Sequence, residues 1–138
     1  MKIAVVLAPL ALAVTVATMP ALDAVAASEA EAAKPYGSYT VRLAPRDPDV
    51  PAGVWRLTLR PGRYTLLNDT NPIMNGGRLS VSGNVLTFSR ETLCPSDVGR
   101  YRWILSDGRL RLRPVGTDTC SGNDRKVVMT SRPWTKRS

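Results

Sequence analysis

The side chains that could carry acid–base or nucleophilic chemistry are few in this chain. It contains no histidine, which removes the commonest general base and a common metal ligand. No serine lies in the Gly-x-Ser-x-Gly pattern of a strained nucleophile turn. We therefore expect neither catalysis nor a bound metal or cofactor, and a cyclase acting through the shape of its cavity is the remaining enzymatic alternative. The acidic residues beyond residue 35 are Asp47, Asp49, Asp69, Glu91, Asp97, Asp107, Asp118 and Asp124. Most of them lie in turn-like segments, where aspartate is expected for backbone reasons.

Arginines are the most numerous charged residues, and the chain has a formal net charge of +8. Removal of the first 27 residues deletes one base and one acid and leaves that charge unchanged. In the segment 99–113, Arg100, Arg102, Arg111 and Arg113 alternate with apolar residues, so they share one predicted outer face. Such a basic face could bind a polyanion, although a charge run is more often only solvated.

Asp118 and Arg125 flank Cys120 at a spacing that allows a loop-closing ion pair. We expect this pair to be structural, because such pairs usually order loops. The alternative gives Arg125 a role in holding the acidic group of a ligand.

Period-two alternation dominates the chain after residue 37 and predicts half-buried strands. Turn residues at Pro61-Gly62, Gly83-Asn84 and Asp107-Gly108 predict three hairpins. Each turn places apolar residues opposite apolar residues: Leu57 with Leu66, Leu59 with Tyr64, Leu79 with Phe88, Val81 with Leu86, Trp103 with Leu112 and Leu105 with Leu110. The run Lys126–Thr130 is predicted as a last strand, with Trp134 just beyond it.

About eight sequential antiparallel strands favour an all-β up-and-down barrel, which removes exposed sheet edges. A sandwich is the alternative. A barrel of eight strands is either filled by side chains or holds one small ligand. Five aromatic residues share the predicted inward face and could fill the core or line a pocket: Trp55, Tyr64, Phe88, Tyr101 and Trp103.

The first residues predict export from the cell. Lys2 precedes an apolar run that ends in Ala24-Val25-Ala26-Ala27, which is the pattern of a secretory signal peptide. A membrane span is disfavoured, because Pro9 and Pro20 interrupt the run and no basic cluster follows it. We expect residues 1–27 to be the signal peptide, 28–36 a flexible leader and 37–138 a single barrel domain, secreted as a monomer.

Cys94 and Cys120 are the only cysteines, and export would place them in oxidising surroundings. We predict a disulfide that closes a loop of about 27 residues, worth roughly 3 kcal/mol of stability. Metal binding is disfavoured, because two lone cysteines lack the spacing of a ligand set.

From Gly53-Val54-Trp55 to Trp134 the chain resembles small secreted lipocalin-like (calycin-type) β-barrels of actinobacteria. The shared phrases include residues 83–88 (Gly-Asn-Val-Leu-Thr-Phe), 99–103 (Gly-Arg-Tyr-Arg-Trp) and Asp118-Thr119-Cys120. The resemblance implies a barrel and a small apolar ligand. It also implies a late arginine lying across Trp55, for which Arg132 is best placed and Arg125 is the alternative.

The sequence thus leaves two functions open. The first is a secreted carrier that holds a small apolar or amphipathic ligand among the five inward aromatic residues. The second is a cationic interaction protein whose arginine face meets an anionic polymer, a cell-wall component or a protein partner. Sequence-specific nucleic-acid recognition is not expected, because no helix-turn-helix or zinc module is present.

Overall fold

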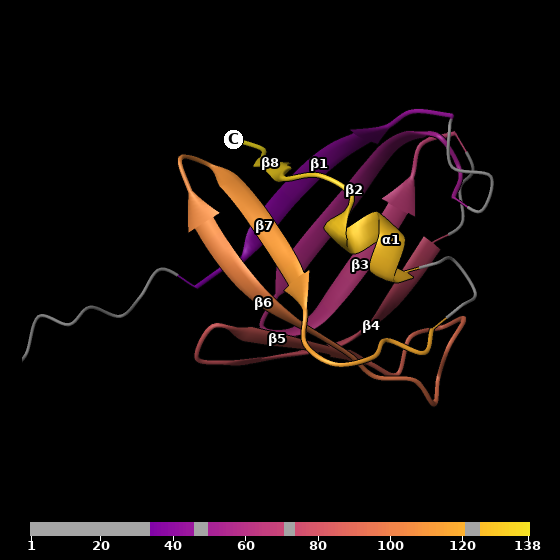
Figure 1. Cartoon of the computed structure of the whole chain (residues 1–138), viewed down its shortest axis with the longest axis vertical. Coiled ribbons are helices and arrows are strands. Elements are labelled where there is room, and N and C mark those ends of the chain that lie inside the picture. The colour runs from indigo at the N-terminus through magenta and orange to yellow at the C-terminus, as the bar shows by residue number, and fades with distance from the viewer. Residues whose placement is uncertain (1–33, 46–49, 71–73, 121–124) are drawn as a thin grey trace, which may run out of the picture. The chain divides into compact units, whose positions relative to one another are not determined.

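The computed structural model describes residues 34–45, 50–70, 74–120 and 125–138 (Figure 1). The strands are β1 (Gly37–Leu43), β2 (Gly53–Arg60), β3 (Gly62–Asn68), β4 (Met74–Ser82), β5 (Val85–Ser89), β6 (Gly99–Ser106), β7 (Arg109–Pro114) and β8 (Trp134–Lys136), and a short helix α1 (Arg125–Thr130) precedes β8. All neighbouring strands are antiparallel, and β8 returns to β1, so the sheet is a closed up-and-down barrel. The prediction of an all-β, eight-stranded antiparallel barrel is confirmed. The predicted signal peptide and most of the predicted leader lie outside the described residues.

The three predicted hairpins have the predicted register. Leu57 faces Leu66 and Leu59 faces Tyr64; Leu79 faces Phe88 and Val81 faces Leu86; Trp103 faces Leu112 and Leu105 faces Leu110. At the β6–β7 turn, Asp107 and Gly108 have φ of 50° and 70°. Positive φ at both positions is what a two-residue type I′ turn requires. The turn residues therefore set which side chains of each hairpin point inward.

The barrel closes through a strand of only three residues. Two residue pairs join β8 to β7 and two join it to β1. The chain reaches β8 through α1, which packs against β7. Within the described part of the chain, no helix is long and apolar enough to cross a membrane.

The prediction of a strand at Lys126–Thr130 is wrong, because these residues belong to α1. The run contains two β-branched valines, which favour a strand locally. However, the adjacent residues Val128 and Met129 are both fully buried. Successive side chains of a strand point to opposite faces, whereas two adjacent helical residues can share a buried side. Tertiary packing therefore overrides the local preference.

Side chains fill the interior of the barrel. The buried apolar cluster contains Tyr39, Val41, Val50, Trp55, Leu57, Leu59, Tyr64, Leu66, Leu79, Leu86, Phe88, Tyr101, Leu110, Leu112, Val128, Met129 and Trp134. Trp134 lies in β8, and its indole nitrogen donates a hydrogen bond to the Met129 carbonyl at 3.1 Å. This residue therefore ties the short last strand to α1.

Candidate functional site

The inward aromatic residues are packed against one another. Phe88 makes edge-to-face contacts with Tyr64 and Tyr101, at centroid distances of 4.7 and 5.6 Å. Trp55 is buried with them, and Trp103 is partly buried. Phe88 and Tyr101 are fully buried and Tyr64 is 1% exposed, so almost none of their surface borders solvent or an internal void. A ligand between these rings would require the core to open.

A buried cluster of charged and hydroxyl groups lies beside these rings. Arg125 Nη1 binds Glu91 Oε2 at 2.7 Å. Its Nε and Nη2 bind the two carboxylate oxygens of Asp118, each at 2.7 Å. The Tyr64 hydroxyl donates to Glu91, and the Tyr101 hydroxyl donates to Asp118. The structure therefore places the predicted pair Asp118–Arg125 inside a five-residue network.

The predicted disulfide Cys94–Cys120 adjoins this network, with its Cα atoms 5.5 Å apart. The Cys120 amide donates to Asp118 Oδ1 at 3.0 Å, and the Cys120 sulfur lies 3.8 Å from Glu91 Oε1. Ligand atoms of Glu91 and the two cysteines lie within 4.8 Å of one another. Metal binding there would need free thiolates, and the two sulfurs are joined to each other.

Hydrogen bonds fix the charge state of the network. Burial alone would raise the pKa of Asp118, but bonds from Arg125, Tyr101 and a backbone amide outweigh it and hold that pKa below its ordinary value. Burial alone would lower the pKa of Arg125, but its bonds to Asp118 and Glu91 raise it. Burial and the neighbouring carboxylates raise the pKa of both tyrosines. Asp118 is therefore ionised at neutral pH, Arg125 is charged and the phenols are neutral.

The network is closed to any substrate, because the side chains of Arg125, Glu91 and Asp118 are at most 1% exposed. Gly99 makes room for it, since a Cβ there would lie 2.8 Å from Arg125 Nη2. The network attaches α1 to the segments that follow β5 and β7. Its arrangement supports a structural role.

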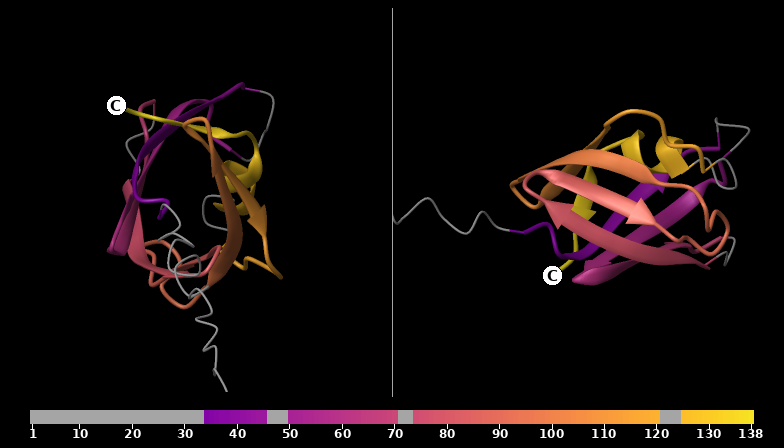
Figure 2. Two further views of the ribbon diagram at one scale, coloured as in Figure 1. Left: turned by 90° about the vertical axis from the view of Figure 1, so that its left-hand side faces the viewer. Right: turned by 90° about the horizontal axis from the view of Figure 1, so that it is seen from below.

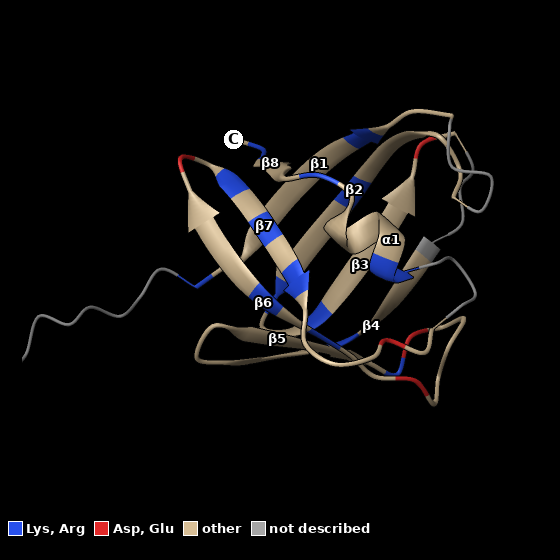
Figure 3. Cartoon of the chain, in the orientation of Figure 1, with Lys and Arg blue, Asp and Glu red and all other residues tan. Residues whose placement is uncertain are grey.

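The outer surface of β6 and β7 is the second candidate site. The predicted basic residues are all exposed, and they alternate with the inward residues Tyr101 and Leu112. Figure 3 shows basic residues in blue along β6 and β7. Arg109 has the same outward phase as Arg111 and Arg113. We call the whole set the β6–β7 arginine face: Arg100, Arg102, Arg109, Arg111 and Arg113.

The strand register brings these arginines close together. Arg102 lies directly opposite Arg113, and Ile104 lies opposite Arg111. Alternate residues along β7 are about 6.7 Å apart, so its three outward arginines form an evenly spaced line. The face therefore presents a row of charges along β7 and further charges across the strand on β6.

No described strand carries an acidic residue. The described carboxylates all lie between strands, and the ion pairs of the described residues involve only Arg125. The outward strand arginines are therefore not neutralised by any described carboxylate: Arg42, Arg56, Arg60, Arg63 and Arg78 in addition to the β6–β7 arginine face. The wall of the barrel is a positively charged surface.

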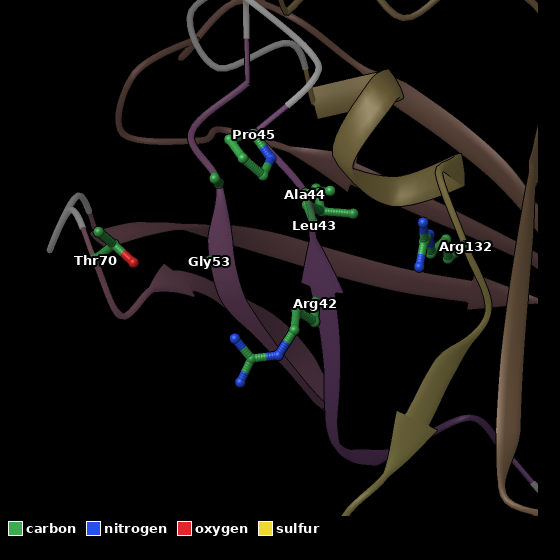
Figure 4. A pocket seen from close by; sticks show the side chains of 8 residues that line it. Arg42, Leu43, Ala44, Pro45, Gly53, Thr70 and Arg132 are labelled. Atoms are coloured by element: carbon green, nitrogen blue, oxygen red, sulfur yellow. The ribbon is translucent and has the colours of Figure 1, made fainter.

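A pocket of ≈ 260 Å³ borders the face, and Arg111, Arg113 and Arg132 line it. Arg132 also lines a pocket of ≈ 520 Å³ together with Arg42, on the side of β1 (Figure 4). The arginine-lined surface thus continues from β7 across the segment before β8 to β1.

The sequence did not predict Arg109 or Glu91 as site residues, and it did not predict the part that Arg132 and Tyr64 take in these two sites. Arg109 could have been found from its phase, since it stands two residues before Arg111. Arg132 lies outside any strand, so alternation gives no signal for it. Glu91 and Tyr64 meet Arg125 across 34 and 61 residues of sequence, which no local pattern reveals.

The arginine expected to lie across Trp55 stays a prediction for both candidates. Arg132 is exposed and lines surface pockets, and the guanidinium of Arg125 binds Glu91 and Asp118. The Trp55 indole nitrogen instead donates to the Pro51 carbonyl at 2.9 Å.

Comparison of the chain with protein-family models, with curated proteins and with solved structures found no match. The outer arginines and the filled interior are therefore the features of the described chain that bear on its function.

Proposed function

We propose that this chain is an exported, non-catalytic protein that binds a linear, phosphate-rich polymer through the β6–β7 arginine face. The observation that carries the proposal is that Arg102 lies directly opposite Arg113 and that neither is paired with a described carboxylate. Like charges in directly opposite positions destabilise a sheet. A bound polyanion would remove that repulsion.

Arginine suits a phosphate-rich partner, because its planar guanidinium donates two parallel hydrogen bonds to one phosphate group, as it also does to a carboxylate. The line of arginines along β7 favours a chain with repeated charges over a single small anion. The pocket lined by Arg111, Arg113 and Arg132 offers a place where one such group could be held from several sides.

The same surface favours a polymer without bases over a nucleic acid. Proteins that bind single-stranded nucleic acid combine a basic groove with exposed aromatic side chains on which bases stack. The large apolar residues exposed in the described chain are Leu93, Val98, Ile104 and Val115, and none is aromatic. Polyphosphate and polyol phosphates therefore match the face better.

The proposal also includes export of the protein from the cell and a barrel of the lipocalin-like kind. Export is supported by the signal-peptide pattern of residues 1–27, which lie outside the described residues, and by a disulfide typical of oxidising compartments. A small ligand inside the barrel has less support, because the rings that would hold it pack directly against one another.

The test is binding of fluorescently labelled polyphosphate, measured by anisotropy over a series of salt concentrations. We expect Arg102→Gln/Arg113→Gln to weaken binding by about tenfold or more and to reduce the salt slope by about 2. The matched control is Lys34→Gln/Arg90→Gln, which removes the same charge from exposed positions outside the strands. Equal losses in the two variants would show a response to net charge and contradict a specific face. Tighter binding of single-stranded DNA than of polyphosphate would assign the face to nucleic acid.

A further inference from the structure

A second group of arginines lies on the strands β2, β3 and β4. Arg60 is opposite Arg63 across one turn, and Arg63 is opposite Arg78 in the next strand pair. All three are exposed, and none is paired with a described carboxylate. We call these three residues the β2–β4 arginine row.

This row has the same unfavourable geometry as the β6–β7 arginine face. Two of its cross-strand pairs place like charges directly opposite each other, which costs stability in a sheet. A pocket of ≈ 400 Å³ adjoins it, lined by Arg60 and Arg63 together with Thr58, Tyr64 and Thr65. Guanidinium groups beside threonine hydroxyls form a donor set suited to a phosphate group.

The two groups of arginines are centred on different walls of the barrel, one on β3 and the other on β7, and their nearest members lie on β4 and β6, which are two strands apart. In the closed strand order, β3 and β7 are four strands apart in either direction. Figure 2 (left) shows the magenta strands and the orange strands on opposite sides of the barrel. At about 4.8 Å per strand step, the path around the wall from β3 to β7 is roughly 19 Å.

We infer that the protein binds two polyanion chains at once, one on each wall, and so bridges them. The inference rests on the proposed function. A straight chain lying along β7 does not cross the strands that carry the β2–β4 arginine row, because the middle strand of that row, β3, is four strands away. Each wall therefore takes its own chain, and the filled barrel, which is closed by the pairing of β8 with β1, acts as a spacer between the two.

The test mixes the exported form of the protein with short polyphosphate chains, some labelled with a donor dye and some with an acceptor dye. Energy transfer between the two dyes is then measured. We expect transfer with the wild-type protein and two chains bound per protein. Arg60→Gln/Arg63→Gln/Arg78→Gln should keep binding through the β6–β7 arginine face but lose the transfer and bind one chain. Lys34→Gln/Arg90→Gln should retain the transfer.

The outcomes separate the two proposals. No binding by the wild-type protein would overturn the proposed function and the bridging with it. Tight binding of a single chain, without transfer, would overturn the bridging alone. Transfer that persists in the triple variant would also overturn it, because self-association or wrapping of one chain would then be the cause. Sedimentation of the free protein identifies self-association directly.

Discussion

Arg102 on β6 and Arg113 on β7 occupy directly opposite positions in the sheet, and both side chains are exposed. Arg60, Arg63 and Arg78 repeat this arrangement on the other wall. Opposite charges at such positions stabilise a sheet, and like charges destabilise it. These like-charged pairs make the barrel less stable than oppositely charged pairs at the same positions would. Such a loss of stability is expected where surface residues serve binding.

Arg113→Glu should separate stability from binding. It replaces the like-charged pair by an opposite-charged pair with Arg102, so the free energy of unfolding should rise by about 0.5 kcal/mol. The affinity for polyphosphate should fall at the same time. Urea denaturation and anisotropy measure the two effects, with Arg113→Gln as the intermediate case. A variant that is less stable and binds as before would refute both the repulsion and the role of the face.

Arg125→Met should be strongly destabilising. It leaves Glu91 and Asp118 buried without their cation, and loss of one partner of a buried pair costs about 3–5 kcal/mol. The neighbouring Lys126→Met is the control, because Lys126 is exposed on the same helix. Arg125→Lys, which keeps the charge but loses the two-pronged contact, should fall between them in urea denaturation. A loss below about 1 kcal/mol for Arg125→Met would mean that the network contributes little.

The stability of the barrel should fall in acid because of Asp118. Its pKa in the folded protein is lowered by the bonds from Arg125 and Tyr101, which outweigh the effect of burial. A lowered folded pKa gives stability that is complete above the unfolded value of about 4 and is lost as the pH falls through the folded value. Urea denaturation at a series of pH values should therefore show a steeper acid loss for the wild-type protein than for Asp118→Asn. Asp107→Asn, in an exposed turn, should keep the wild-type slope.

Phe88→Ala tests whether the interior is filled. Phe88 is fully buried between contacts to Tyr64 and Tyr101, so its truncation should cost about 3–5 kcal/mol. Leu93→Ala is the matched control at an exposed position and should change stability little. Thermal and urea unfolding of both variants check this. If Phe88→Ala lowered the free energy of unfolding by less than about 1 kcal/mol, the interior would be loosely packed, and the hypothesis of a small ligand inside the barrel would gain support.

Local sequence patterns were sufficient to predict most of the barrel strands and their inward faces. Period-two alternation gives the inward face of each hairpin, and turn residues such as Asp107-Gly108 fix the register, since a shift by one residue would turn every apolar side chain outward. The same alternation placed Arg100, Arg102, Arg111 and Arg113 on one outer face. The failure at Lys126–Thr130 has the opposite cause, because there the buried surroundings of Val128 and Met129 decide the backbone, and those surroundings come from distant strands.

By itself, the sequence determined the three hairpins, the disulfide pairing and the outward phase of the arginines, because each depends on neighbours in the chain or on a choice between only two cysteines. Only the tertiary structure decided that Arg125 binds Glu91, that α1 replaces a predicted strand and that Arg63 lies beside Arg78. Arg125 and Glu91 lie 34 residues apart, so only folding brings them together, and the β3–β4 register that places Arg63 opposite Arg78 has no two-residue turn motif that predicts it. The positions of the two arginine groups around the barrel are also decided by the tertiary structure, since they follow from the order of strands in the closed sheet.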